Sequence, residues 1–298
     1  MRRPRAGIAL HQPDHRREGG AGAAGQRQRH GGSAQGPEAQ GRQAVTGRAR
    51  RDAFTLIEVL VVIAIVAVLV SVLLPALGKA RLQAGALACG ARLQQLSVGL
   101  ALYLNEYDQT LPQTRGPLPG GGESVIGALF GGTKGTLPFY GVSTIGAERR
   151  PLNRFVVDSP VPPDSEPGRA ELAVYRSPVD RGSENTGIPV PGLGRCDSMY
   201  DFVGSSYTLN DHSLEGEGAA TLVPPGGGRM PMVAQASRTW VIGTHTIYNF
   251  QQDGDRGMRW FGAGAVQASL AFLDGHVRMR VAVPVGVRNT TPDYTFLP

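Results

Sequence analysis

Residues 53–70 read AFTLIEVLVVIAIVAVLV, an apolar run that one carboxylate, Glu58, interrupts near its start. From residue 54 to residue 77 the other interruptions are Thr55, Ser71 and Pro75. A helix over these residues is about 36 Å long, which is enough to cross a hydrocarbon core of about 30 Å. A charged side chain costs about 2.5–3.5 kcal/mol at the centre of such a helix and less near its edge. Glu58 is therefore a candidate functional residue.

Two ordinary interpretations compete for this segment, a secretory signal peptide and a plain signal anchor. Arginines precede it at positions 48, 50 and 51, and the uninterrupted apolar run 59–70 has the length of a signal-peptide core. A small-residue cleavage site could follow at 76–78. Neither interpretation accounts for a carboxylate five residues after Ala53, so both are disfavoured.

The string from Arg51 to Glu58 resembles the processing site of type IV pilin-like proteins, including the pseudopilins of type II secretion. That family has a small residue, usually Gly, before Phe-Thr-Leu-Ile-Glu and a hydrophobic helix. The resemblance implies that a prepilin peptidase cuts between Ala53 and Phe54 and that the new Phe54 amine is methylated. It also implies that Glu58 pairs with the N-terminal amine of a neighbouring subunit, and that Pro75 kinks the helix.

Four shorter motifs resemble segments of a group of pilin-like proteins abundant in planctomycetes. They lie at 89–96, 175–180, 205–210 and 272–277, and the last contains Asp-Gly-His at 274–276. Two positions depart from the pattern of that group, because Ser177 stands where a cysteine is usual and Gly264 where a histidine is usual. The resemblance extends over residues 48–280 and implies a pilin-like fold.

The net charge of +6 lies wholly in residues 1–53, which hold eleven arginines and four acidic residues. Residues 54–298 hold 19 basic and 20 acidic residues, so this part has no electrostatic footprint for nucleic acid. The leader 1–53 is rich in Gly, Gln, Ala and Arg and cannot form a core, so we expect it to be disordered and removed. Because prepilin leaders are usually shorter, a true start near Val45 is also expected.

The arginines of the leader predict the orientation of the chain in the membrane. By the positive-inside rule they keep the N-terminus in the cytoplasm. The expectation is a single pass through the inner (cytoplasmic) membrane with the C-terminal domain outside, and possible display in an extracellular filament.

After Leu77 the helical periodicity continues but becomes amphipathic. Apolar side chains recur at steps of three and four residues and form one stripe, which comprises Leu82, Ala86, Cys89, Leu93, Leu96, Leu100, Tyr103 and Tyr107. Glycines at 85, 90 and 99 argue against a free-standing coiled coil, so we expect the stripe to pack on the protein's own sheet. The helix is predicted to end near Tyr107, before Pro112.

The rest of the chain is predicted to be a loop-rich β-sheet domain. Strands are expected at 172–175, 206–209, 239–242, 268–273 and 277–283, and Asp274-Gly275 predicts a hairpin between the last two. The Gly/Pro-rich segments 112–170 and 214–229 are expected to be irregular, with short pieces near 124–130 and 154–157. The prediction is an α+β fold divided into leader 1–53, membrane half-helix 54–77, amphipathic half-helix 78–110 and globular domain 111–298.

The two cysteines, Cys89 and Cys196, leave two possibilities open. Outside the cytoplasm they could form a disulfide that joins the helix to the sheet domain. Alternatively both thiols are free, with the one on the stripe buried as a small apolar side chain.

The remaining polar residues give weak indications of chemistry. Asp253 and Asp255 flank a glycine and are weak calcium candidates, but two carboxylates are too few for a site of six to eight oxygens. His212, His245 and His276 lack zinc-site spacing, and neither a nucleophile elbow nor a phosphate-binding loop is present in the sequence. The chain is therefore predicted not to be an enzyme and to need no cofactor.

Two functional hypotheses follow. The first is a structural subunit, a prepilin or pseudopilin, whose partners are prepilin peptidase, other pilin-like subunits and membrane lipid, with no role for nucleic acid. The second is a monomeric surface-binding protein with the same anchor, in which loops at 112–170 and 211–230 recognise a ligand. A membrane-anchored hydrolase is disfavoured.

Overall fold

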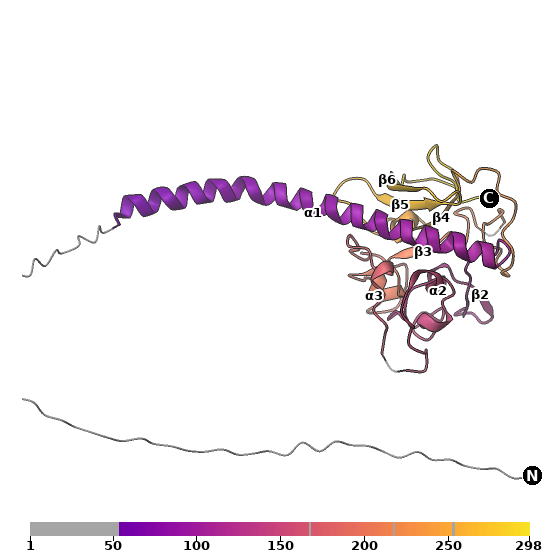
Figure 1. The fold of residues 1–298 in the computed structure, drawn as a ribbon. Helices are drawn as coiled ribbons and strands as arrows, with labels where there is room; N and C mark the ends of the chain where they lie inside the picture. Colours follow the sequence, from indigo (N-terminus) through magenta and orange to yellow (C-terminus); the bar gives the residue numbers. More distant parts are fainter. Residues whose placement is uncertain (1–53, 167, 217, 252–253) are drawn as a thin grey trace, which may run out of the picture. The chain divides into compact units, whose positions relative to one another are not determined.

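The computed structural model describes residues 54–298 apart from 167, 217 and 252–253 (Figure 1). Ala53, the rest of the predicted leader and the expected start near Val45 lie outside the described residues. All the helices and strands below belong to one compact unit, Leu56–Pro298.

The N-terminal helix α1 is a single element of 51 residues, Leu56–Glu106 (Figure 1). None of its residues from 56 to 85 is buried, whereas the half that follows buries one face. That face comprises Ala86, Cys89, Gly90, Leu93, Leu96, Ser97, Gly99, Leu100, Tyr103 and Leu104. The predicted helix and its apolar stripe are thus confirmed, and the end at Glu106 is one residue from the expected position.

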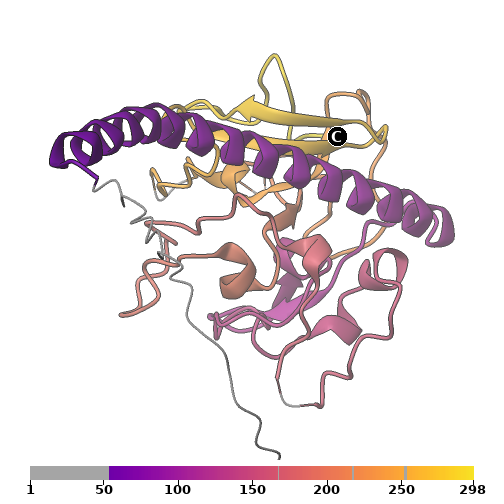
Figure 2. The ribbon, with the colours of Figure 1, turned by 60° about the vertical axis from the view of Figure 1, so that its left-hand side comes forward.

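The second half of α1 packs on a four-stranded antiparallel sheet in the order β3-β4-β5-β6 (Figure 2). The strands are β3 (Tyr207–Leu209), β4 (Trp240–Thr244), β5 (Gln267–Phe272) and β6 (Val277–Ala282). Each lies within a residue or two of its predicted bounds. The stripe therefore packs on the chain's own sheet, and the architecture is the predicted α+β class, in which a long apolar helix precedes antiparallel sheets.

The hairpin between β5 and β6 forms at Asp274-Gly275, as predicted. The Phe272 N–H donates to the His276 carbonyl over 2.9 Å, and Gly275 has a φ of +92°, which favours glycine. The side chains of Gln94 and Ser97 in α1 both donate to the Gly275 carbonyl over 3.3 Å. The turn is therefore fixed to the helix as well as closing the hairpin.

Two glycines of α1 permit a close approach to neighbouring elements. A Cβ at Gly99 would lie 2.1 Å from Cγ1 of Val156, and a Cβ at Gly90 would lie 2.3 Å from Sδ of Met279. Since real Cβ atoms do not approach so closely, any side chain at either position would displace its neighbour.

The chain outside α1 and the four-stranded sheet contains more short elements than the sequence predicted. They are the ribbon β1 (Arg115–Pro117) with β2 (Glu123–Val125), η1 (Gly127–Leu129), η2 (Ala147–Arg149), α2 (Asn153–Val156), η3 (Ala173–Tyr175), α3 (Met199–Val203) and η4 (His245–Tyr248). The pieces expected near 124–130 and 154–157 are present. Among the described residues of 214–229, no helix or strand occurs, which agrees with the predicted loop.

The strand predicted at 172–175 is wrong, because Ala173–Tyr175 form the 3₁₀ helix η3. The Tyr175 N–H bonds back to the Leu172 carbonyl over 3.0 Å, so it is not available for a ladder. The short helix α3 was missed, although Ser198 caps it by accepting from the Asp201 N–H and Gly204 ends it at a φ of +91°.

A buried guanidinium orders much of the irregular region. Arg150 is fully buried and donates to the carbonyls of Ile145, Ala128, Gly131 and Val203 over 3.0–3.2 Å. Burial lowers the pKa of Arg150 to about 9, so the group remains charged at neutral pH. One side chain thus satisfies carbonyls from several loops that have no ladder partner.

Candidate functional site

The first turn of α1 explains part of the position of Glu58. The helix begins at Leu56, so Thr55 occupies the N-cap position and Glu58 the third helical position, which is the spacing of a capping box. A carboxylate in the first turn is also stabilised by the helix dipole. Phe54 and Glu58 are both exposed, so a partner outside the described chain can reach either side chain.

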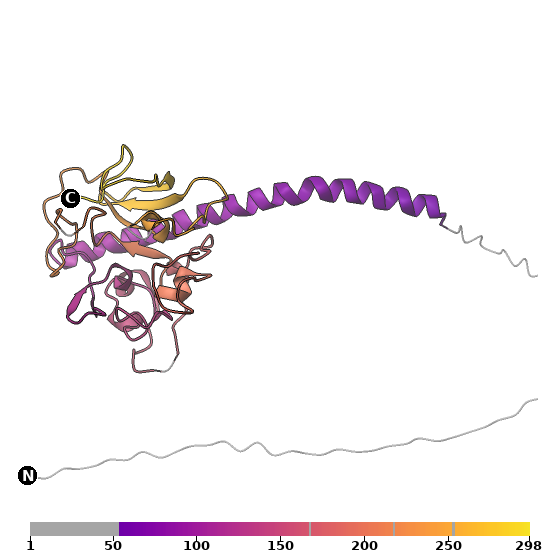
Figure 3. The ribbon, with the colours of Figure 1, turned by 180° about the vertical axis from the view of Figure 1, so that it is seen from behind.

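The first half of α1 is long and apolar enough to cross a membrane, and none of its most apolar window is buried within the protein. Pro75 lies inside the helix and has no N–H for the Ser71 carbonyl. In the same stretch of helix, the Ser71 hydroxyl donates to the Val68 carbonyl over 2.7 Å. The helix continues through this point and curves gently along its first half (Figure 3).

Apolar side chains also occupy the outer face of the second half of α1. Leu87, Val98 and Leu102 are exposed by 62%, 55% and 55%, on the side away from the sheet. The second half of α1 thus carries exposed apolar side chains in addition to the face that the sheet covers.

The motifs at 89–96, 175–180, 205–210 and 272–277 meet around this helix. The Asp180 carboxylate accepts from the backbone N–H groups of Met199 and Tyr200 over 3.0 and 2.8 Å and from the Ser206 hydroxyl over 2.7 Å. Ser206 Oγ in turn accepts from the Ser177 N–H over 2.9 Å. These motif residues connect loops to the sheet, and this accounts for them structurally.

The two cysteines lie in different surroundings, and neither is in a disulfide. Cys89 is buried beside the hydroxyl groups of Ser177 and Tyr207, and burial raises the pKa of its thiol. Cys196 Sγ lies 3.6 Å from Sδ of Met199, and burial raises the pKa of its thiol to about 11. The possible Cys89–Cys196 bridge is therefore not formed in this structure, because each sulfur packs against other partners.

The weak calcium candidates can be described only in part. Asp253 lies outside the described residues. Asp255 accepts from Asn249 Nδ2 over 2.9 Å and from the Gly257 N–H over 2.8 Å, and it pairs with Arg259. The hydrogen bond from Arg259 is the main cause that lowers the pKa of Asp255 to about 2. Asp255 thus serves its own loop, and calcium binding there stays a prediction.

The three histidines do not converge. His276 pairs with Asp274 over 2.5 Å and stacks on Phe272 at the hairpin. His212 and His245 instead line a common cavity of about 370 Å³ in the globular domain. Among the described residues no group of three or more His, Cys, Asp or Glu side chains is placed to hold a metal ion. The sequence missed this cavity because its walls come from segments far apart in the chain.

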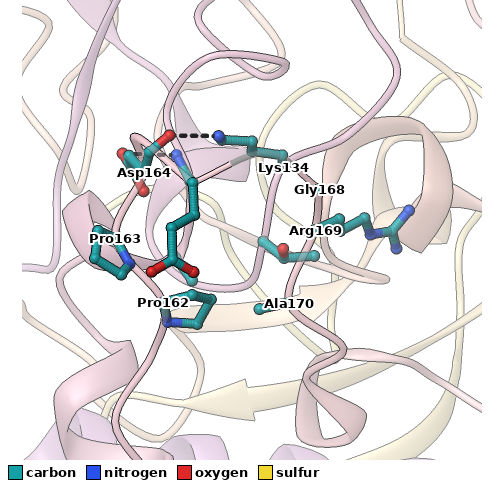
Figure 4. Close-up of a pocket in the computed structure, with 11 residues that line it drawn as sticks. Lys134, Pro162, Pro163, Asp164, Gly168, Arg169 and Ala170 are labelled. Carbon is teal, nitrogen blue, oxygen red and sulfur yellow. Dashed lines mark hydrogen bonds between the residues drawn. The ribbon is translucent and has the colours of Figure 1, made fainter. Parts of the chain in front are cut away.

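A second, smaller pocket of about 110 Å³ is lined by Lys134, Asp164 and Arg169 (Figure 4). Both of its cations already have partners. Lys134 Nζ donates to the Asp164 carbonyl over 2.6 Å, and Arg169 pairs with Asp201 over 2.9 Å. Both cations are thus already engaged within the protein.

The fold and the N-terminal site together define a protein with one membrane-capable helix and an α+β globular domain. Residues 48–74 match the family model described as the prokaryotic N-terminal methylation motif. The match supports a prepilin-like protein, processed at its N-terminus, and fits a membrane-anchored, surface-exposed location. Comparison with curated proteins and with solved structures gives no match.

Proposed function

We propose that this chain is a prepilin subunit, cut between Ala53 and Phe54 and methylated on the new Phe54 amine. The α1 helices of many copies of the subunit then bundle into a type IV pilus-like or type II secretion pseudopilus-like filament. The observation that carries this proposal is the division of α1 into an apolar half that the protein leaves uncovered and a second half that its sheet covers.

The uncovered half needs an apolar environment. Burying a large aliphatic side chain contributes about 1.5–3 kcal/mol, so a run of them left in water is strongly unfavourable. Lipid covers this half before assembly, and neighbouring copies of α1 cover it in the filament. The exposed Leu87, Val98 and Leu102 extend the same contact beyond the membrane.

The chain crosses the inner membrane once, with its basic leader in the cytoplasm and its globular domain outside. Prepilin peptidase and other pilin-like subunits are its partners. N-terminal mass spectrometry of the native protein tests the processing step. A mature terminus at Phe54 carrying one extra methyl group is expected, whereas Met1 or a terminus near Gly78 contradicts the proposal.

In the assembled state Glu58 pairs with the Phe54 amine of the neighbouring subunit. A carboxylate and an ammonium group in lipid are far less costly together than apart. The capping-box position gives Glu58 a second role in its own helix, and the two roles must be separated experimentally.

Glu58→Ala removes both roles, whereas Glu58→Gln keeps a capping side chain and removes the charge. The assay is the yield of sheared filaments from cells that also contain the prepilin peptidase. We expect both variants to abolish filaments while the cleaved subunit remains in the membrane. Normal assembly of Glu58→Gln shows that capping alone is needed, and this result would falsify the charge pairing. Glu123→Gln, an exposed carboxylate change in β2, is the matched control.

The second candidate is an anchored monomer that binds a ligand with its globular domain. The cavity of about 370 Å³ favours it, because that volume suits a small molecule. Under this alternative the membrane-bound Glu58→Ala protein keeps its ligand binding and the cellular function that depends on it. Under the filament proposal the activity is lost with the filaments.

A further inference from the structure

One cavity of the globular domain is lined by residues of η1, α3 and η4 and by no residue of α1. It has a volume of about 370 Å³, and its walls come from seven separate stretches of the chain. Nothing in the assembly proposal uses this cavity. The cavity is therefore available for a ligand that is independent of assembly.

One wall of the cavity is apolar. Leu137, Val142, Ile188, Phe202 and Met258 line it, and all but Ile188 are buried. Such a wall favours a ligand whose body is hydrocarbon or aromatic.

Other residues of the lining are polar, and several of them bond to one another. Asp211 accepts from the Gly127 N–H over 2.7 Å and pairs with Nδ1 of His212 over 2.7 Å. Nε2 of His212 lies 2.7 Å from Gln251 Nε2, and the His212 ring stacks on Tyr248. These contacts hold the wall in one arrangement without a ligand.

The charges of the lining balance. The lining contains one acidic side chain, Asp211, and one basic side chain, Arg256, whose charges are opposite in sign. An ion entering such a site would lose its hydration without gaining a counter-charge of its own. The lining therefore favours an uncharged ligand.

His245 also lines the cavity, and one of its ring nitrogens is buried. The residue is 8% exposed, and its Nε2 has no hydrogen-bond partner among the described residues. Burial is the main cause that lowers the pKa of His245 to about 4, so the ring is neutral at pH 7. Its ring interacts with the Ser205 backbone, which leaves Nε2 as an acceptor without a donor. A buried acceptor without a donor is costly, and such groups are uncommon in folded proteins.

We propose that this cavity binds a small uncharged molecule that is mainly apolar and carries one hydroxyl or N–H group. The apolar body lies against Val142, Ile188 and Phe202. The hydroxyl or N–H end lies against His245 and donates to Nε2 after a small shift of the wall. Binding at this site does not require filament assembly.

The test uses two probes of the same shape, 4-methylphenol and toluene, which differ by one hydroxyl group. Each is titrated into the full-length processed protein in detergent and followed by calorimetry and saturation-transfer NMR. We expect 4-methylphenol to bind at least about fivefold more tightly than toluene, as one added buried hydrogen bond predicts. Equal affinities, or no binding of 4-methylphenol, would overturn the proposal.

Two variants locate the site. Ile188→Trp fills the cavity from a half-buried position on the apolar wall, and we expect it to abolish binding of both probes. Val190→Trp makes the same change two residues away, at an exposed position outside the cavity, and should leave binding unchanged. If Ile188→Trp binds 4-methylphenol as the unmodified protein does, the site lies elsewhere and the proposal is wrong.

His245→Phe tests the role of the acceptor. We expect this variant to bind both probes with similar affinity, because the preference for the hydroxyl is lost. If the variant does not fold, the 15N shifts of the His245 ring in the unmodified protein replace it as the readout. A shift on addition of 4-methylphenol but not of toluene supports the contact, and identical shifts contradict it.

Discussion

The hydroxyl of Tyr207 in β3 donates a hydrogen bond of 3.2 Å to the backbone carbonyl of Cys89 in α1. Tyr207 is fully buried, and its oxygen also lies 3.6 Å from the Cys89 sulfur. The contact joins the helix to the sheet at the point where the covered half of α1 begins. The membrane-capable half therefore starts from a position that the globular domain fixes.

A disulfide can be built at this point. The Ser177 hydroxyl hydrogen-bonds the Cys89 thiol, so a cysteine introduced at position 177 brings two sulfurs together. We expect Ser177→Cys to form a bridge between the introduced cysteine and Cys89 under oxidising conditions and to stabilise the protein by about 2–4 kcal/mol. Denatured, non-reduced protein should then show one free thiol, Cys196. Three free thiols exclude the bridge, and the same change in a Cys89→Ala background is the control.

The glycines of α1 should respond differently to alanine. At Gly99 the new Cβ meets the short, branched Val156 side chain and the Phe155 carbonyl, neither of which can easily move. We expect Gly99→Ala to destabilise the protein by about 1–3 kcal/mol, measured by denaturant unfolding.

At Gly90 the neighbour is the flexible end of Met279, and alanine gains about 1 kcal/mol of helix propensity. We therefore expect Gly90→Ala to be close to neutral. Gly78→Ala, with nothing within 4 Å, measures the propensity gain alone. Equal losses at Gly90 and Gly99 would show that the close approach at Gly99 is not decisive.

The pH dependence of stability should carry a contribution from His245. Its pKa falls from 6.5 to about 4 on folding, so the unfolded chain binds more protons between these values. The free energy of unfolding is therefore expected to decrease as the pH falls from about 6.5 to 4, by up to about 3 kcal/mol.

His245→Gln should remove this dependence, measured by urea unfolding at a series of pH values. His276→Gln, at the half-exposed hairpin, is the matched control and should retain it. A His245→Gln curve parallel to that of the unmodified protein would assign the slope to other groups.

Arg150 should tolerate no substitution. Arg150→Met removes the donor from four carbonyls at once, three of them buried, and each buried carbonyl costs about 1–3 kcal/mol when unsatisfied. We expect the loop region to lose its native structure, seen as loss of hydrogen-exchange protection around α2 and α3. Arg154→Met, at an exposed arginine four residues away, should leave that protection intact.

The local sequence pattern was sufficient to predict the elements that have a clear hydrophobic periodicity or a characteristic turn sequence. The stripe from Ala86 to Tyr103 predicted the covered face of α1, and Asp274-Gly275 predicted the β5–β6 hairpin, because both depend on neighbouring residues in the chain. Residues 172–175 show the limit. Their apolar run resembles a strand, but a local 3₁₀ bond competes with the ladder, and the sequence does not reveal which wins.

The sequence alone determined three features of the N-terminal region. They are the methylation motif, the membrane-capable helix and the carboxylate at the start of that helix. These follow from composition and from contacts within a few residues. Only the tertiary structure decided that Cys89 meets Ser177 rather than Cys196, that Arg150 binds carbonyls from three separate segments, and that His212 and His245 share a cavity. Each of these depends on segments far apart in the chain, and their packing has no local period from which it could be predicted.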